Sequence, residues 1–406
     1  MHVTVRPDRL VAGGDAMARD VDGRIVFVRG ALPGEEVDVE VETAKKDFAK
    51  GVVVDVRDPS SDRIEPQCHH RRNGCGGCGW MHIEPDAQLE AKTEIVRESL
   101  RRIGRLSPEV VDGLVDMGAA VHPFRYRTTI RVVGGPDGGL GFREEASGTV
   151  VPINSCDVAD RALSDILPEL SIAPGVEVTL RTSLATGALT VRWDKPKGRP
   201  GTGLVSGVPE QAHIGDRAFL VEVVDGHELR VSAGSFFQSG VQAAELLVDA
   251  VRRAAPELAT ASHAVDAYGG VGLFAATVMA DAGRVTLIES SKSACFDAEH
   301  NLAHRDARVV RREVGGWSTD EAVDVVVADP ARPGLGKPGV AALTAVAPAP
   351  IVLVSCDPVS LARDVTLLAA AGYHPARVEV LDLFPQTHHV ETVTRFDKVV
   401  PGTTLS

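Results

Sequence analysis

The stretch Asp266-Ala-Tyr-Gly-Gly-Val-Gly272 follows an apolar run, His263–Tyr268, and precedes a run of helical spacing, Leu273–Ala282. Glycines at a strand-to-helix turn let the backbone turn tightly and approach a ligand closely. Glu289 ends the next apolar run, where a carboxylate can accept hydrogen bonds from a ribose diol. The glycines do not form a clean G-x-G-x-x-G and no phosphate-binding lysine follows. The pattern therefore favours S-adenosylmethionine over a dinucleotide. The alternative is a purely structural glycine-rich turn that binds no ligand.

Helical and apolar runs alternate around this stretch from residue 240 onward. The expected strands are 263–268, 284–289, 307–313, 322–329, 351–355, 377–383 and 390–396. The expected helices are 242–254, 273–282, 293–304, 340–346 and 359–371. Strands that alternate with helices predict a parallel sheet covered on both faces, with ligands at the carboxyl ends of the strands. This part is expected to be an α/β domain of the Rossmann type.

The N-terminal half has a different pattern. Residues 1–60 contain short runs of period-two alternation separated by turns, which predicts a small antiparallel, OB-like β-barrel. Such a barrel could bind oligonucleotides. The alternative is a structural cap or a dimerisation module. The pattern of residues 61–235 predicts mostly strands, apart from a helix near 85–103. The expected domains are therefore 1–60, 61–235 and 236–406.

Composition limits the choice of partners. The chain has 406 residues, 44% of them hydrophobic and 24% charged, with a formal net charge of −13. An acidic chain argues against an indiscriminate nucleic-acid coat but permits a local basic groove. The N-terminus carries arginines and no apolar run, and prolines interrupt the longest apolar stretch, 340–354. We expect a cytoplasmic protein with no membrane partner.

The six cysteines are unevenly placed, with Cys68, Cys75 and Cys78 clustered and Cys156 downstream. In a reducing compartment such a cluster indicates a metal site rather than disulfides. The spacing C-x6-C-x2-C with a distant fourth cysteine fits either zinc or an iron–sulfur cluster. The adjacent His69 and His70 are possible zinc ligands, although surface histidines are the simpler interpretation.

Two further strand ends carry reactive groups, in Asp329-Pro-Ala-Arg-Pro-Gly334 and Ser355-Cys-Asp-Pro358. From position alone, Cys356 is equally compatible with a nucleophile and with a small buried side chain. The Asp-Pro turn after it favours a projecting thiol. Cys295, inside a helix with apolar spacing, is expected in the core.

These strand ends resemble those of the RNA uracil-5 methyltransferase family, specifically its iron–sulfur subgroup with an N-terminal TRAM barrel. The motifs that carry the resemblance span nearly the whole chain. They are Val11–Arg19, Leu32–Glu35, Cys75–Cys78, Ser235–Gln238, Asp266–Gly272, Asp329–Gly334, Ser355–Asp364 and Asp382–Glu391. The resemblance implies a class I methyltransferase domain at the C-terminus, an N-terminal TRAM barrel and a central, mostly β domain with an iron–sulfur cluster.

The resemblance also implies roles for individual residues. Cys356 matches the nucleophile and Glu391 the base that removes the proton from carbon 5. The positions that match binders of S-adenosylmethionine are Gln238, Tyr268, Gly270, Glu289 and Asp329. The ligands of a 4Fe–4S cluster match Cys68, Cys75, Cys78 and Cys156, with zinc less favoured. The chain departs from the family at Gly240 and Asp357, where an asparagine is usual, at Leu273, and in a Cys68–Cys75 spacing that is one residue longer.

The expected activity is methylation of carbon 5 of a uridine in RNA. The resemblance favours 23S ribosomal RNA over the T-loop of transfer RNA. The uridine must leave its stack, so we expect a flipped base or a single-stranded loop and a monomeric enzyme. Two alternatives are an inactive RNA-binding or iron-sensing protein on the same fold, and a methyltransferase of amino groups, which needs no nucleophilic cysteine.

Overall fold

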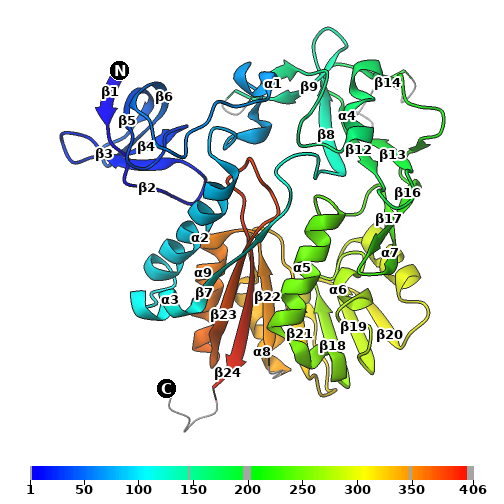
Figure 1. Ribbon diagram of the computed structural model, residues 1–406. Coiled ribbons are helices and arrows are strands. Elements are labelled where there is room, and N and C mark those ends of the chain that lie inside the picture. Colours follow the sequence, from blue (N-terminus) through cyan, green and yellow to red (C-terminus); the bar gives the residue numbers. More distant parts are fainter. Residues whose placement is uncertain (1, 145–146, 195–202, 347–349, 400–406) are drawn as a thin grey trace.

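The computed structural model describes residues 2–144, 147–194, 203–346 and 350–399. Figure 1 shows three parts: a small β-domain at the N-terminus, a central β-rich part, and a large sheet with helices that contains the C-terminal half. Among the helices that the structure describes, none has the length and apolar character needed to cross a lipid bilayer.

The N-terminal domain is a six-stranded sheet in the order β1-β5-β6-β4-β3-β2. Its strands are β1 (His2–Val5), β2 (Arg9–Leu10), β3 (Ala16–Arg19), β4 (Ile25–Arg29), β5 (Glu36–Ala44) and β6 (Phe48–Asp58). The period-two alternation buries one face of each strand, and Val26, Val28, Val37 and Val39 form its core. Trp80, Ile83 and Ile95 from the following segment pack into the same core, so the domain is anchored to the rest of the chain.

The central part contains a second six-stranded sheet in the order β10-β9-β8-β12-β13-β15. These strands are β8 (Thr129–Gly134), β9 (Leu140–Arg143), β10 (Val150–Pro152), β12 (Glu177–Thr182), β13 (Leu189–Trp193) and β15 (His213–Ile214). Two short ladders accompany it, β11 (Ser171–Ile172) with β14 (Val205–Ser206), and β16 (Phe219–Val224) with β17 (His227–Ser232). Two short helices, α1 (His69–Arg72) and α4 (Arg161–Ser164), also lie in this part.

The C-terminal part is an eight-stranded sheet in the order β20-β19-β18-β21-β22-β24-β23-β7. Its strands are β7 (Val115–Ala120), β18 (His263–Ala267), β19 (Arg284–Glu289), β20 (Ala307–Arg311), β21 (Val325–Ala328), β22 (Ile351–Ser355), β23 (Tyr373–Asp382) and β24 (Glu391–Lys398). Its helices are α2 (Pro85–Arg102), α3 (Pro108–Leu114), α5 (Val241–Ala254), α6 (Leu273–Ala276), α7 (Lys292–Asn301), α8 (Gly336–Ala345) and α9 (Pro358–Ala370).

Neighbouring residues of the central strands pack into different cores. Ala264, Val325 and Val352 join the core on the α5 side, whereas Val265 and Val326 join the core that contains α8 and α9. A sheet covered on both faces explains why these strands are apolar throughout. The α/β fold class predicted from the sequence is confirmed.

Three expectations need correction. Strand β7 and helices α2 and α3 fall within the expected domain 61–235, yet β7 pairs in parallel with β23 and α2 packs on β23, β7 and α9. The reason is that Val96 and Leu100, on the apolar side of α2, are fully buried in the C-terminal core.

The second correction concerns the helix expected over 273–282, which ends at Ala276 and continues as turns. The Arg305 side chain donates hydrogen bonds to the carbonyl oxygens of Ala275, Met279 and Ala280, and so satisfies groups that a longer helix would pair internally. The third correction is that β24 runs antiparallel to both β22 and β23, although a parallel sheet was expected throughout.

Candidate active site at the carboxyl edge of the sheet

Cys356 and Glu391 face each other across the β22–β24 pair. The last paired residues of the ladder are Ser355 and Thr392, and the two strands are antiparallel. The next opposing positions are therefore Cys356, just after β22, and Glu391, the first residue of β24. Residues directly opposite in an antiparallel pair have Cβ atoms about 4.5–5.5 Å apart. The reversal of β24 is what brings this carboxylate to the edge where β22 ends.

Local sequence explains the position of the thiol. β22 consists of five buried residues and ends at Ser355, and α9 begins three residues later at Pro358. Asp357 caps this helix, because its Oδ1 accepts a hydrogen bond of 2.7 Å from the Ser360 N–H. The aspartate that replaces the usual asparagine thus retains a capping role. Cys356 stands in the sharp strand-to-helix turn and is half-buried.

Carboxylates determine the electrostatics of this site. Burial, with the charges of Glu391 and Asp329, raises the pKa of the Cys356 thiol to about 12, and the Arg332 guanidinium opposes this shift. Burial and the charge of Asp329 raise the pKa of Glu391 well above its usual value. Burial raises the pKa of Asp329 to about 7. At neutral pH the resting site therefore holds a protonated thiol beside groups that readily take up protons.

Arg332 and His389 are site residues that our sequence analysis did not single out. Arg332 Nη2 lies 3.2 Å from His389 Nε2. Burial and the neighbouring cations His388, Arg332, Arg127 and Lys92 lower the pKa of His389 to about 3, so its ring is neutral. Both residues lie inside motifs quoted above, but no local pattern distinguishes them from solvent-exposed side chains.

The predicted cofactor residues gather at the ends of β18 and β19. The Gly270 N–H donates to Glu289 Oε2 at 3.1 Å, and the Ser291 N–H donates to Glu289 Oε1 at 2.7 Å. Tyr268 adopts a left-handed φ of 61°, which is uncommon for a bulky residue and marks a specialised turn. Glu289 is half-buried at the end of its strand, where each carboxylate oxygen retains a lone pair for a further donor.

Gln238 reaches the same edge from the central part of the chain. It is 6% exposed, whereas Phe236, two residues earlier, is 72% exposed. The following residue, Ser239, donates from Oγ to the carbonyl oxygen of Leu383, in the loop between β23 and β24. A side chain at Gly240 would lie 2.1 Å from the carbonyl oxygen of Tyr126. This contact explains why glycine replaces the asparagine that is usual there.

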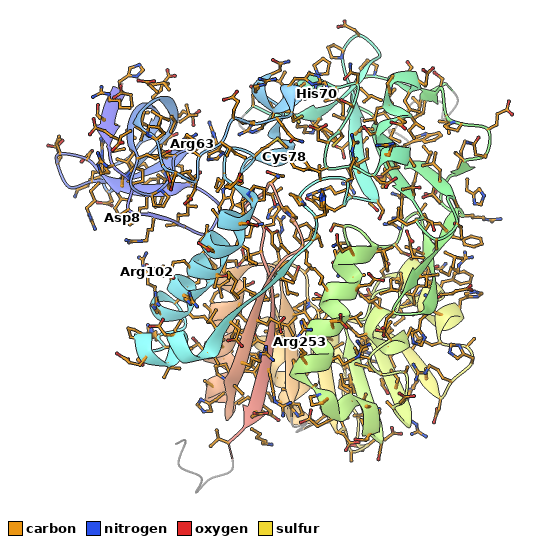
Figure 2. The ribbon with its side chains drawn as sticks, in the orientation of Figure 1. Asp8, Arg63, His70, Cys78, Arg102 and Arg253 are labelled. Carbon is orange, nitrogen blue, oxygen red and sulfur yellow. The ribbon has the colours of Figure 1, made fainter. Side chains whose placement is uncertain are left out.

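The four predicted metal ligands line one cavity of about 220 Å³, together with Arg71, Arg127 and His70. They are Cys68, Cys75, Cys78 and Cys156. Burial and the neighbouring cysteines Cys156, Cys75 and Cys68 together raise the pKa of Cys78 to about 12, against the opposing charge of Arg127. Figure 2 shows His70 and Cys78 on the segment that precedes α2, above the large sheet.

The cavity is lined by cysteine thiols, a donor type that both zinc sites and iron–sulfur clusters use. Across the described ranges, no three His, Cys, Asp or Glu side chains stand close enough together to share one metal ion. The cavity volume is several times the roughly 30 Å³ of one water molecule. His70 is hydrogen-bonded through Nε2 to Asn154 Oδ1 at 2.9 Å, so its interpretation as a zinc ligand gains no support. Cys295 is 4% exposed, as expected for a core residue.

Comparisons with known proteins identify the relatives of this chain. A model of the TRAM domain matches residues 1–54. An uncharacterized RNA methyltransferase of Streptomyces coelicolor is 36% identical, over 96% of this chain and 91% of the relative. Another uncharacterized RNA methyltransferase, of Gloeobacter violaceus, is 32% identical over 98% of this chain and 96% of the relative.

Among solved structures, the tRNA (uracil-54, C5)-methyltransferase of Pyrococcus abyssi in complex with S-adenosyl-L-homocysteine is similar over its full length. Its TM-score is 0.72 at 25% sequence identity, covering 98% of this chain and 100% of that chain.

Proposed function

The chain belongs to the RNA uracil-5 methyltransferase family, and we propose that it methylates carbon 5 of a uridine through a covalent adduct on Cys356. That it is an S-adenosylmethionine-dependent RNA methyltransferase follows from the family. The position of the methyl group and the roles of the residues are the proposal. The observation that carries it is the register of β22 and β24: beyond their last pair, Ser355 and Thr392, the half-buried Cys356 and the buried Glu391 come next at the same edge of the sheet.

Carbon 5 of uracil is too weak a nucleophile to attack a sulfonium directly. Cys356, after losing its proton, adds to carbon 6, and the electrons of the carbon 5–carbon 6 double bond move to form an enolate. S-adenosylmethionine supplies the methyl group that the enriched carbon 5 takes. Glu391 then removes the hydrogen from carbon 5, the sulfur–carbon 6 bond breaks, and the double bond is restored.

Burial and the charge of Asp329 raise the pKa of Glu391, so its carboxylate accepts a proton more readily than an ordinary glutamate does, as a general base requires. Arg332 lies near enough to Cys356 to oppose its raised pKa, so it stabilises the thiolate needed for the first step. In this proposal Gln238, Tyr268, Gly270, Glu289 and Asp329 hold S-adenosylmethionine. Glu289 does so at the ribose diol, using the lone pairs that its backbone partners leave free.

We propose a stem-loop or single-stranded region of RNA as the substrate, because the thiol must reach carbon 6 past the base stack. The iron–sulfur resemblance favours 23S ribosomal RNA. A second candidate is transfer RNA, which is favoured by the similarity to the archaeal enzyme named for uracil-54.

The test is to incubate the protein and S-adenosylmethionine with ribosomal or transfer RNA that lacks 5-methyluridine, and to map new 5-methyluridine by mass spectrometry. Cys356→Ala should abolish the product while RNA binding persists, and the matched variant Cys295→Ala should retain activity. RNA methylation at an amino group that persists in Cys356→Ala would favour the amino-group methyltransferase instead. RNA binding without product from the intact protein would favour the inactive binding or sensing protein.

For the cysteine-lined cavity we propose a 4Fe–4S cluster held by Cys68, Cys75, Cys78 and Cys156, with zinc as the alternative. The support is four free thiols around one cavity, two of them buried (Cys75 and Cys156) and two half-buried, with Arg71 and Arg127 to balance the negative charge of thiolate ligands. The group would link residues 68–78 to residue 156 and stabilise the fold. Iron, sulfide and zinc analysis of protein purified without oxygen distinguishes the two metals, and Cys156→Ser should lower the bound metal.

A further inference from the structure

The sheet of the central part has one apolar face and one basic face. Ile130, Val132, Val178, Leu180 and Val191 point to one side and are buried in the main core. Side chains on a strand alternate between the two faces, so the residues between them share the other face. Its charged members are Arg131, Arg143, Glu177, Arg181 and Arg192.

The register places the first two arginines on the same face of the sheet. Val133 pairs with Gly141 at the end of the β8–β9 ladder, and Arg131 and Arg143 each lie two residues beyond this pair on their strands. On the other side of β8, Thr179 pairs with Arg131. The Arg131 and Arg143 side chains are 70% and 52% exposed, so both are open to solvent.

Glu177 is the carboxylate that both arginines share. Its Oε1 lies 3.0 Å from Arg143 Nη2, and its Oε2 lies 3.9 Å from Arg131 Nη1. Two cations against one anion leave a net positive charge on this patch, on a chain whose net charge is −13. Arg192 contributes no excess charge, because Asp194 and Asp216 lie 2.8 and 3.0 Å from it.

A cavity of about 340 Å³ opens at this patch. Arg131, Arg143 and Glu177 line it together with Gly76 and Gly77, which lie between Cys75 and Cys78 in a short 3-10 helix. Two glycines without side chains leave their backbone open to a ligand. Guanidinium groups beside accessible backbone are the surroundings that phosphate oxygens prefer.

The basic face also leads toward the candidate active site. Arg181 lies on the same face of β12, is 5% exposed, and donates to the carbonyl oxygens of Ser232 and Ser235 at 3.1 and 2.9 Å. Ser235 begins the segment that carries the exposed ring of Phe236 and then Gln238. Arg181 therefore joins the basic face of this sheet to the segment that carries Gln238.

We propose that Arg131 and Arg143 bind the phosphate backbone of the RNA strand that flanks the target uridine, and that Glu177 weakens this binding by competing for both guanidinium groups. This inference rests on the proposed function and names a surface through which the substrate is held. The mechanism is electrostatic, so it predicts the salt dependence of binding as well as its strength.

The experiment compares Arg131→Ala/Arg143→Ala with Arg102→Ala/Arg252→Ala, a matched control that removes the same charge. Arg102 lies on α2, away from the cysteine segment (Figure 2), and both control residues are exposed in the structure. Binding of a labelled, uridine-containing single-stranded RNA is measured against salt concentration in the Cys356→Ala background. Methylation by the corresponding variants with Cys356 intact gives KM and kcat.

The first double variant should bind roughly tenfold more weakly at low salt, and its slope of log affinity against log salt should be shallower by about 1.4–1.8, as for two lost phosphate contacts. KM for RNA should rise while kcat is unchanged. Glu177→Gln should bind RNA more tightly than the parent. Equal binding by the two double variants, or weaker binding by Glu177→Gln, would overturn the proposal.

The two proposals fail separately. If the intact protein forms no 5-methyluridine but Arg131→Ala/Arg143→Ala still loses RNA affinity, the surface stands and the proposed reaction does not. If the reaction occurs with unchanged KM in this variant, the reaction stands and the surface does not.

Discussion

Lys92 Nζ lies 2.6 Å from Asp382 Oδ1, and neither side chain is more than 1% exposed. The same ammonium group donates to the carbonyl oxygen of Phe384 at 3.2 Å. One turn earlier on α2, Gln88 Oε1 accepts a 2.7 Å hydrogen bond from the Gln386 N–H. Helix α2 thereby holds the loop that connects β23 to Glu391 at the start of β24. In Figure 1 this red loop rises above the large sheet toward the segment that precedes α2.

The backbone of this loop needs such support. Gln386 has a left-handed φ of 68°, which is unfavourable for a residue with a side chain. The backbone N–H of Trp80 also donates to the Gln386 carbonyl oxygen at 2.9 Å. Partners on both backbone groups and on the side chain hold Gln386 in this conformation, and local strain of this kind is typical of functional loops.

Lys92→Met should destabilise the fold strongly. Burial lowers the pKa of Lys92 to about 8 and raises that of Asp382, so each charge depends on the other. Removing one partner of a buried pair costs about 3–5 kcal/mol, because it leaves the other charge unpaired. Urea unfolding measures the loss. Lys92→Met/Asp382→Asn should recover part of it, and the exposed Lys46→Met should change stability little. An unchanged unfolding midpoint for Lys92→Met would contradict the account.

Gly14→Ala should impair catalysis more than Gly13→Ala. Both glycines have a left-handed φ, so both substitutions carry a backbone cost of roughly 1–2 kcal/mol. A Cβ at Gly14 would lie 2.6 Å from His388 Cβ, whereas a Cβ at Gly13 meets nothing within 4 Å. The N-terminal domain therefore touches the loop that leads to Glu391. We expect Gly14→Ala to lower kcat roughly 10- to 100-fold relative to Gly13→Ala. Equal kcat values would show that this contact has no influence on the reaction.

Much of the fold could be predicted from the sequence, because the patterns that specify its strands and helices are local. The strands β18 to β22 are short apolar runs separated by helical segments, and their order along the chain predicts a doubly covered sheet. Strand β7 was missed because Val115–Ala120 is an edge strand with a weak pattern, and its partner β23 lies far along the chain. No local rule predicts such a long-range parallel pairing.

The residues of the candidate site also differ in whether local sequence could identify them. Cys356 and Glu391 were identifiable from their motifs, but their direct opposition depends on the antiparallel direction of β24. Lys92 was not identifiable, since a lysine on an amphipathic helix normally faces water. Its burial depends on Asp382, which is brought close only by the folded sheet.

The Glu222 carboxyl should make stability depend on pH. It is fully buried, and burial raises its pKa to about 7, against the opposing effects of Leu184, Ser183 and Arg181. The folded pKa exceeds the unfolded value near 4.5, so the folded state binds more protons between these limits. The contribution of Glu222 to the free energy of unfolding is fully present below about pH 4.5 and is lost as pH rises through 7. The loss amounts to at most about 3 kcal/mol.

Urea unfolding between pH 5 and pH 8 tests this assignment. The Glu222→Gln variant should show a smaller fall in unfolding free energy over that range than the parent. The matched substitution of an exposed carboxyl, Glu40→Gln, should leave the slope unchanged. Parallel pH profiles for Glu222→Gln and the parent would refute the raised pKa.

Glu391→Gln should trap the proposed intermediate. The amide cannot take the hydrogen from carbon 5, so elimination of Cys356 stops after the methyl group has been added. We expect turnover to fall by about 10²–10⁴-fold. An RNA–protein band that carries label from the methyl group of S-adenosylmethionine should persist in a denaturing gel. The double variant Cys356→Ala/Glu391→Gln should give no such band. Normal turnover by Glu391→Gln would assign the base to another group.

Asp329→Asn and Arg332→Ala should change the reactivity of Cys356 in opposite directions. The charge of Asp329 raises the pKa of the thiol, and Arg332 lowers it. Removing the carboxylate increases the thiolate fraction at a fixed pH below the pKa, and removing the guanidinium decreases it. The thiolate is the species that reacts with iodoacetamide, and one unit of pKa changes its fraction about tenfold in that range.

Alkylation of the ligand-free protein at pH 8, resolved by peptide mass spectrometry, isolates this effect from cofactor binding. Cys356 should react faster in Asp329→Asn and more slowly in Arg332→Ala than in the parent. Cys295, a buried core thiol, should stay unmodified in all three proteins, which shows that the fold remains intact. Two shifts in the same direction would mean that the substitutions act through access to the thiol. Opposite shifts would establish that the carboxylate and the guanidinium together set the charge state of the nucleophile.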